Sequence, residues 1–431
     1  MIVNLYKKQF WINSTNVYEV NLRQYTNEGT ISAFLKELPR LKDMGVETLW
    51  FMPITPIAQK NKKGSLGSYY ACSDYMAVDP EFGTIHDFKQ FVATAHDQGF
   101  KVIIDWVANH TGWDHRWTID HPDFYIKDIL TGDFKMASGM EDIIELNYEN
   151  PALRNAMITA MEFWIHECDI DGFRCDLAFW VTVDFWNQAR ARIEKIKTLF
   201  WLAEADPIEQ PQYVAPFDAM YTWEWMHKSE QFYKTNTGFY TLTNLLNEYN
   251  EACGNTIIPV WFTTNHDENS WNGTEYEKYG AMSALLTVFS FTWNGIPLIY
   301  SGQEAGNLKR LQFFEKDVIE WNGYKLHDFY KTLLNLRKKN KALIANDRSG
   351  STYILPVNDL NVLAFFRKNR NDEVWVLLNF SKDPVSFLLV SEHLTGAYDN
   401  VFNSGSFEAK GNKQIDLNAW EYLLFQRNNE L

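Results

Sequence analysis

The run Lys101-Val102-Ile103-Ile104-Asp105-Trp106-Val107 decides how this sequence folds. It is short, almost continuously apolar and rich in branched side chains. Such runs are typical of strands in a parallel sheet that is covered on both faces. A carboxyl group, Asp105, lies close to its carboxyl end, and Asn109 and His110 follow shortly after.

Seven further strand-like runs are found along the first ~345 residues, at 17–25, 48–54, 172–178, 199–205, 219–223, 259–265 and 297–303. Longer amphipathic patterns with helical spacing separate them, for example at 31–45, 85–99 and 326–344. Eight strand–helix units in alternation predict an α/β fold of the closed (β/α)8, or TIM barrel, type rather than an open doubly wound sheet.

Two segments depart from the alternation and define the expected domains. About forty residues rich in Asp, Trp, His and Gly follow the third strand, too many for an ordinary loop, and predict a small inserted subdomain over 111–148. Beyond 346, β-type runs at 351–356, 361–367, 373–379 and 420–426 predict an antiparallel C-terminal β-domain over 347–431. The barrel itself then comprises 1–110 and 149–346.

Composition narrows the classes of partner. The net charge of −15 argues against nucleic acid or an anionic membrane surface and is compatible with a neutral sugar. No apolar run is long enough to cross a bilayer, and the amino terminus shows no signal-peptide pattern. The four cysteines lack metal-ligand spacing and do not form a disulfide pattern, so a reduced, cytoplasmic protein is expected. Its oligomeric state is left open.

Ionisable side chains occur at the ends of three neighbouring predicted strands. Arg174 and Asp176 alternate on one side of the fourth strand, Glu204 ends the fifth, and Asp267 follows the seventh. In a parallel barrel all these ends open at one mouth, where active sites lie. Arg174 beside Asp176 is either a structural ion pair or a device that keeps a nucleophilic carboxylate charged and oriented.

Acids that meet in this way suit glycoside hydrolysis. Retention at the anomeric carbon needs two carboxyl groups close together, one attacking the carbon and the other protonating the leaving oxygen. A third carboxylate can hold the sugar hydroxyls as the ring flattens. Each acid alone is ambiguous, and His110 or His266 alone is equally explained as a satisfied hydrogen-bonding group.

Taken in order, these segments identify a known pattern. The stretches 105–110, 172–176, Glu204 and 265–267 resemble, on the same strands, the four signature regions of the α-amylase family of glycoside hydrolases. The stretches 67–75, 79–83 and 295–304 fit the same family near strands 2 and 8. The resemblance extends over essentially the whole chain and includes the three-domain plan.

The resemblance implies a role for each matched position. Asp176 would be the nucleophile, Glu204 the general acid/base and Asp267 the transition-state stabiliser. Four further residues would bind or position the sugar and the nucleophile, namely Tyr70, His110, Arg174 and His266. Asp105 and Asn109 would support the site without reacting.

The sequence departs from the family after the nucleophile, where Trp180 replaces a histidine that is common in α-amylases. Many members bind a structural Ca2+ there, with an asparagine at the position of Asn109 as the candidate metal ligand. The nearby acids Asp128, Asp133, Glu141 and Asp142 are interpreted as surface charges, so no cofactor is required and Ca2+ is not expected. Phe179 and Trp180 would either contact the sugar or pack beneath the rim.

Several activities share this pattern. Hydrolysis of α-1,4-glucosidic bonds in maltodextrin or starch, an α-glucan substrate, is the main hypothesis. A cyclomaltodextrinase, neopullulanase, α-glucosidase or glucan transferase would use the same catalytic residues. Neopullulanase-type enzymes usually carry an added N-terminal β-domain, which is not expected here because the first strand begins near Val17. A non-catalytic carbohydrate-binding barrel is the alternative of another class, disfavoured because all three acids are present.

Overall fold

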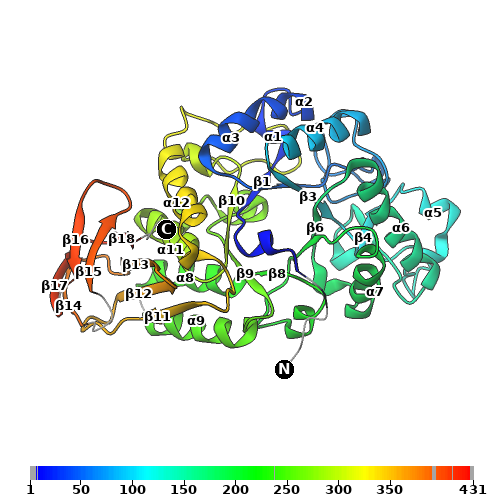
Figure 1. Ribbon diagram of the computed structural model, residues 1–431. Coiled ribbons are helices and arrows are strands. Elements are labelled where there is room, and N and C mark those ends of the chain that lie inside the picture. Colours follow the sequence, from blue (N-terminus) through cyan, green and yellow to red (C-terminus); the bar gives the residue numbers. More distant parts are fainter. Residues whose placement is uncertain (1–5, 7, 237, 391–394, 410, 428–431) are drawn as a thin grey trace.

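Eight parallel strands form a closed barrel in the computed structural model, which describes residues 6, 8–236, 238–390, 395–409 and 411–427 (Figure 1). The predicted fold class is confirmed. The strands are β1 (Val17–Val20), β2 (Thr48–Phe51), β3 (Lys101–Trp106), β6 (Gly172–Cys175), β7 (Phe200–Ala203), β8 (Ala219–Tyr221), β9 (Ile258–Trp261) and β10 (Ile296–Tyr300). Around the ring their order is β1, β10, β9, β8, β7, β6, β3, β2.

Helices surround the barrel (Figure 1). They are α1 (Leu22–Tyr25), α2 (Ile31–Phe34), α3 (Leu38–Met44), α4 (Ile85–Asp97), α6 (Pro151–Cys168), α7 (Val183–Ile193), α8 (Trp223–Thr235), α9 (Phe239–Cys253), α10 (Glu275–Tyr279), α11 (Ser283–Thr292) and α12 (His327–Lys339). Short 3-10 or π turns join several of them: η1 (Phe10–Asn13), η2 (Leu35–Glu37), η5 (Ala178–Trp180), η6 (Pro211–Val214), η7 (Glu268–Asn272), η8 (Gly280–Met282), η9 (Gln303–Ala305) and η10 (Lys341–Leu343).

The helix expected over 31–45 is divided into α2, η2 and α3. Pro39 stands in the first turn of α3 and has no N–H to donate to the preceding turn, which breaks the continuous α-helical ladder. The strand expected over 17–25 is also shorter, because the chain turns at Asn21 and Leu22–Tyr25 are helical. Neither difference alters the order of the barrel.

The segment after β3 forms its own small layer at one side of the barrel in Figure 1, with the C-terminal domain on the other side. It contains β4 (His110–Gly112), α5 (Trp117–Asp120), η3 (Pro122–Phe124), η4 (Ala137–Gly139) and β5 (Ile143–Glu145). β4 and β5 pair antiparallel, with His110 opposite Glu145. His110 therefore has its backbone fixed at the junction of barrel and insertion.

The C-terminal part is an antiparallel β-domain. Its strands are β11 (Gly350–Ile354), β12 (Val362–Asn369), β13 (Asp372–Asn379), β14 (Val385–Leu389), β15 (Gly396–Asn400), β16 (Ser406–Ala409), β17 (Lys413–Leu417) and β18 (Tyr422–Arg427). Six of them form one sheet in the order β11, β12, β13, β18, β15, β16, and β14 pairs with β17. Its own core includes Trp375, Phe387 and Tyr398.

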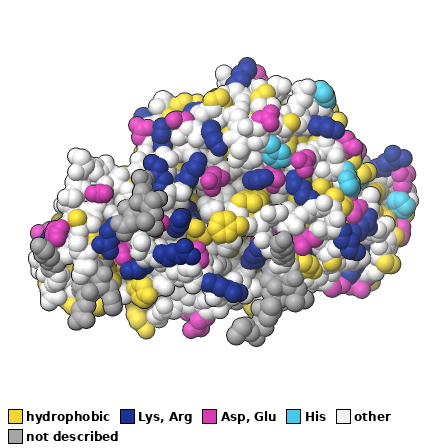
Figure 2. Space-filling model, in the orientation of Figure 1, with side chains coloured by type: hydrophobic (Ala, Val, Ile, Leu, Met, Phe, Trp, Pro, Cys, Tyr) yellow, Lys and Arg dark blue, Asp and Glu magenta, His cyan; other side chains and the backbone are white. Residues whose placement is uncertain are grey.

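The exposed surface carries charged side chains of both signs. Lys and Arg are interspersed with Asp and Glu on the face shown in Figure 2, with no field of a single sign. No helix within the described residues is long and apolar enough to span a membrane. The four cysteines are buried and none forms a disulfide.

Candidate active site

A cavity of about 390 Å³ opens at the carboxyl ends of the barrel strands. The three predicted acids Asp176, Glu204 and Asp267 all line it, together with Tyr70 and His110. The rest of its lining is Lys63, Ser68, Met140, Asp142, Ile143, Leu177, Trp271, Phe313 and Phe314. Carboxyl groups at the floor and aromatic rings at the sides are a combination that suits a sugar.

One buried guanidinium, that of Arg174, organises the floor. Its Nη1 donates to Asp176 Oδ1 and to Asp105 Oδ1, each at 2.9 Å, and its Nη2 is 2.9 Å from Glu204 Oε2 in an ion pair. The guanidinium also lies 4.8 Å from the ring centre of Trp50 in a cation–π contact. Arg174 and Asp176 lie two residues apart on one strand, so both face inward, and the predicted pairing is present.

The charges at this floor do not cancel, because one cation faces three carboxyl groups. Burial and the negative charge of Glu204 raise the pKa of Asp176 well above its ordinary value, although Arg174 opposes them. Burial likewise raises the pKa of Asp105 to about 6.

Leu177 positions Glu204 through its backbone. It follows Asp176 with φ 38° and ψ 49°, in the left-handed region, where residues other than glycine are rare. Its N–H donates to Glu204 Oε2 at 2.8 Å. The strained turn after β6 thus holds the acid of β7 in place, a contact that the sequence does not reveal.

Asp267 and His266 form a second charged group on the opposite side of the cavity. His266 Nε2 lies 3.3 Å from Asp267 Oδ2, and His266 Nδ1 lies 2.5 Å from Oε1 of Glu19 on β1. Burial lowers the pKa of His266, but Asp267 and Glu19 outweigh it and raise the pKa to about 9. The imidazole is therefore a cation at neutral pH, and the Asp267 side chain, 40% exposed, keeps a face open to the cavity.

Tyr70 joins these two groups. Its hydroxyl is 3.1 Å from Asp105 Oδ2 and 2.7 Å from His266 Nε2, and its ring stacks on the His266 ring at 5.4 Å between centroids. Asp105 also accepts from Trp50 Nε1 at 3.2 Å. Asp105 lies beneath the floor as a supporting group, and Tyr70 presents its ring at the cavity wall.

His110 has a free side toward the cavity. Burial lowers its pKa to about 4, so the ring is neutral at neutral pH. Nδ1 lies 3.4 Å from the side-chain amide nitrogen of Asn109, while Nε2 is buried without a hydrogen-bond partner among the described residues. Because His110 also lines the cavity, its ring can form a hydrogen bond with a bound ligand.

Asn109 is the candidate metal ligand, and the acids of the insertion are the side chains that could join it around Ca2+. Of the nearby acids, Asp142 pairs with Lys63 at 2.8 Å, and Asp128 accepts hydrogen bonds from two backbone amides in an exposed turn. Ca2+ requires six to eight oxygen ligands, and both of these acids are already held by other partners. Across the described part of the chain, no group of three or more His, Cys, Asp and Glu is arranged to hold a metal.

Phe179 and Trp180 do not line the cavity. Phe179 packs against the barrel core, and Trp180 is 36% exposed. At this point the cavity wall is formed by Leu177. A packing role for Phe179 was one of the two alternatives drawn from the sequence.

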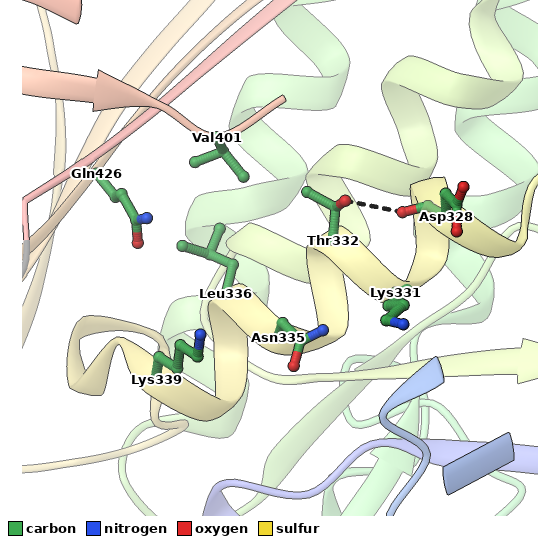
Figure 3. Close-up of a pocket in the computed structure, with 8 residues that line it drawn as sticks. All are labelled: Asp328, Lys331, Thr332, Asn335, Leu336, Lys339, Val401 and Gln426. Atoms are coloured by element: carbon green, nitrogen blue, oxygen red, sulfur yellow. Dashed lines mark hydrogen bonds between the residues drawn. The ribbon is translucent and has the colours of Figure 1, made fainter. Parts of the chain in front are cut away.

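A second hollow, of about 420 Å³, lies along α12 where Val401 and Gln426 of the C-terminal domain approach it (Figure 3). Among the described residues its lining contributes one carboxyl group, Asp328, whose backbone carbonyl accepts from Thr332 Oγ at 2.8 Å. It lacks the paired acids of the first cavity and lies away from the strand ends. The first cavity is therefore the candidate active site.

Sequence reasoning missed several cavity residues. Trp271, Phe313 and Phe314 pack on one another, with Phe313 and Phe314 5.4 and 5.7 Å from Trp271 between ring centres. Glu19, which holds His266, was hidden in an apolar run of β1. A charged residue in the middle of a buried strand was the signal that could have identified Glu19, whereas loop residues gave none.

Comparison with known proteins shows the family to which the chain belongs. The family model "Alpha amylase, catalytic domain" matches residues 6–129 and 123–322. A solved noncanonic maltogenic alpha-amylase from Thermotoga neapolitana is 28% identical, with a TM-score of 0.86 over 96% of this chain and 99% of that one. Alpha-amylase 2 of Dictyoglomus thermophilum is 25% identical over 416 residues, which is 90% of this chain and 70% of the relative.

A cyclomaltodextrinase of Thermoanaerobacter pseudethanolicus is 26% identical over 395 residues, 84% of this chain and 65% of the relative. The family match extends over more than half of the chain and includes the strands that carry Arg174, Asp176, Glu204 and Asp267. The chain belongs to the alpha-amylase family and is a glycoside hydrolase that acts on α-glucans.

Proposed function

We propose that this enzyme cleaves α-1,4-glucosidic bonds in maltodextrins and starch with retention, using Asp176 as nucleophile and Glu204 as general acid/base. One observation carries the proposal. Arg174 contacts both carboxyl groups at 2.9 Å on the floor of the cavity. Two carboxyl groups that share one guanidinium stay close together, as a retaining pair requires.

In the first step, an oxygen of the Asp176 carboxylate attacks the anomeric carbon as the bond to the glycosidic oxygen breaks. Glu204 gives its proton to that oxygen, and the shortened glucan leaves as an alcohol. The hydrogen bond from Arg174 to Asp176 Oδ1 favours the charged form of Asp176, which the attack requires.

In the second step, Glu204, now a carboxylate, takes a proton from water. The resulting hydroxide oxygen attacks the anomeric carbon and displaces Asp176. Asp267 holds the hydroxyls of the flattened ring in both transition states. Burial raises the pKa of Asp267, and the cationic His266 beside it opposes that shift and favours the carboxylate.

The sugar at the cleavage point is held by three further side chains. Tyr70 stacks on its ring, and His110 and His266 bond its hydroxyls. The unpartnered Nε2 of His110 supports this role. A contact of Phe179 or Trp180 with the departing glucan belongs to the same proposal, with Trp180, the more exposed of the two, as the better candidate.

A cyclomaltodextrinase activity is the second candidate, because relatives with that name match over most of the chain. It uses the same catalytic residues and differs in the shape of the glucan. The proposal places the enzyme inside the cell, which is consistent with four buried cysteines and no disulfide.

A timed product profile on maltoheptaose, β-cyclodextrin and pullulan tests the substrate. We expect chromatography to show maltoheptaose cleaved to short linear oligosaccharides, with little product from cyclodextrin or pullulan. Faster cleavage of cyclodextrin would favour the second candidate and leave the catalytic residues unchanged. Absence of product from every α-glucan would overturn the proposed function.

Asp176→Asn removes the attacking carboxylate while preserving the shape of the side chain. We expect kcat on maltoheptaose to fall by at least about 10⁴-fold, with the dissociation constant from calorimetry nearly unchanged. Asp184→Asn, an exposed aspartate of α7, is the matched control and should keep full activity. Near-normal turnover by Asp176→Asn would refute the nucleophile assignment.

Glu204→Gln removes the proton donor. We expect kcat/KM on maltotriose to fall by about 10²–10⁴-fold, and much less on 4-nitrophenyl α-maltoside, whose leaving group needs no proton. Glu209→Gln, at an exposed position shortly after Glu204, serves as the control. Equal losses on both substrates would argue against the acid role.

The His266 cation predicts a pH-dependent stability. Its pKa is raised in the folded protein from about 6.5 to about 9, so its contribution is complete below pH 6.5 and is lost as the pH rises through 9. Melting temperatures measured from pH 6.5 to 9.5 should fall, and Glu19→Gln should reduce that slope because it removes a neighbouring negative charge. The exposed Glu251→Gln should keep the wild-type slope; an identical slope in Glu19→Gln would contradict the assignment.

A further inference from the structure

Three loops are joined across one end of the active-site cavity. They are the segment after β2, the insertion after β3 and the segment after β10, and each contributes side chains to the lining. We refer to this boundary, formed by Lys63, Asp142, Phe313 and Phe314, as the end wall. Neither the catalytic steps nor the predicted sugar contacts use these residues.

An ion pair ties the first loop to the insertion. Lys63 Nζ lies 2.8 Å from Asp142 Oδ1, and the Asp142 side chain is only 6% exposed. A second tie comes from Asp114, whose Oδ2 accepts from the backbone amides of Gln59 and Lys60 at 2.8 and 3.0 Å. The β2 loop is thus tied to the insertion at two places, at Gln59 and Lys60 and again at Lys63.

The same β2 loop is also tied to the segment after β10. The Ser65 N–H donates to Glu315 Oε1 at 2.8 Å and the Ser65 hydroxyl donates to the other carboxylate oxygen. The Leu66 N–H donates to the Phe314 carbonyl at 3.0 Å. At Gly64, a Cβ would stand 2.5 Å from Cβ of Phe314, so the two loops are in close backbone contact.

The barrel order shows which end of the substrate meets this wall. Eight strands form the ring, and β7, which carries Glu204, lies diametrically opposite β1. β2 and β10 flank β1, so their loops face Glu204 across the mouth. Since Glu204 protonates the leaving oxygen, the departing chain lies on its side and the glycone chain extends toward the end wall.

We propose that the end wall closes the glycone end of the cleft, so that the enzyme acts from the non-reducing ends of α-glucans and releases short products of fixed length. The charged Lys63–Asp142 pair lines the cavity there and can bind the hydroxyls of a terminal glucose. In an internal glucose the O4 atom carries the next unit, which would collide with the joined loops. The inference rests on the proposed function and specifies its mode of attack.

Two substrates of the wild-type enzyme test the mode of attack directly. Maltoheptaose labelled at its reducing end should give one dominant labelled product at early times, shorter by a fixed number of units. A 4-nitrophenyl maltoheptaoside whose non-reducing glucose is blocked by a 4,6-O-ethylidene group should be cleaved at least about tenfold more slowly than the unblocked compound.

Variants that separate the loops test the cause. Lys63→Ala combined with Glu315→Ala removes two of the three side-chain ties, one to the insertion and one to the segment after β10, and Lys63→Ala alone removes one. We expect the ratio of blocked to unblocked cleavage to rise in the double variant and the labelled products to become mixed, with a smaller change in the single variant. Glu320→Ala, an exposed acid on the same loop as Glu315, is the matched control and should retain the wild-type ratio.

The outcomes separate this inference from the proposed function. Equal cleavage of blocked and unblocked compounds by the wild-type enzyme, with mixed early products, would overturn the end-wall inference while the hydrolase assignment stands. An unchanged ratio in the double variant, with its melting temperature preserved, would likewise overturn the role of the two ties. Absence of cleavage of all these glucans would instead remove the proposed function itself.

Discussion

Arg174 is a single buried cation among Asp105, Asp176 and Glu204, and the catalytic floor depends on that imbalance. Burying the guanidinium without its partners would cost several kcal/mol, and three carboxylates without it could not all stay charged. With one cation, the group retains excess negative charge, which favours binding of one proton. A retaining glycosidase needs that protonation state, with one carboxylate to attack and one acid to donate.

The barrel makes this arrangement possible because its strands fix the directions of the charged side chains and the distances between them. Arg174 and Asp176 face inward because side chains alternate along β6, and β7 brings Glu204 alongside by parallel pairing of Arg174 with Leu202. The left-handed Leu177 adds an amide to Glu204 at the strand end, where the chain must turn in any case. The left-handed backbone of Leu177 lies directly above the packed barrel, which supports it.

The sequence anticipates the strands of the barrel better than it anticipates the loops. Barrel strands and their terminal acids were predictable, because apolar runs of fixed type end in polar residues that must meet at one mouth. Pro39 breaks a helix that periodicity alone extended. The pairing of Lys63 with Asp142 could not be predicted from sequence, since both lie on loops whose conformations depend on tertiary contacts. The packing of Phe179 likewise depends on the turn at Leu177.

The strands carry the catalytic groups, whereas the loops carry the residues proposed to determine specificity. The Arg174 group rests on strands whose backbone bonds are shared around the closed ring, so a change in a loop leaves its geometry intact. The end wall, by contrast, is held by side-chain contacts at partly exposed positions, such as Lys63 at 37% exposure, which contribute little to overall stability. Contacts of that kind can change without cost to the fold. Related barrels can therefore keep one catalytic floor and differ in whether the glycone end of the cleft is open or closed.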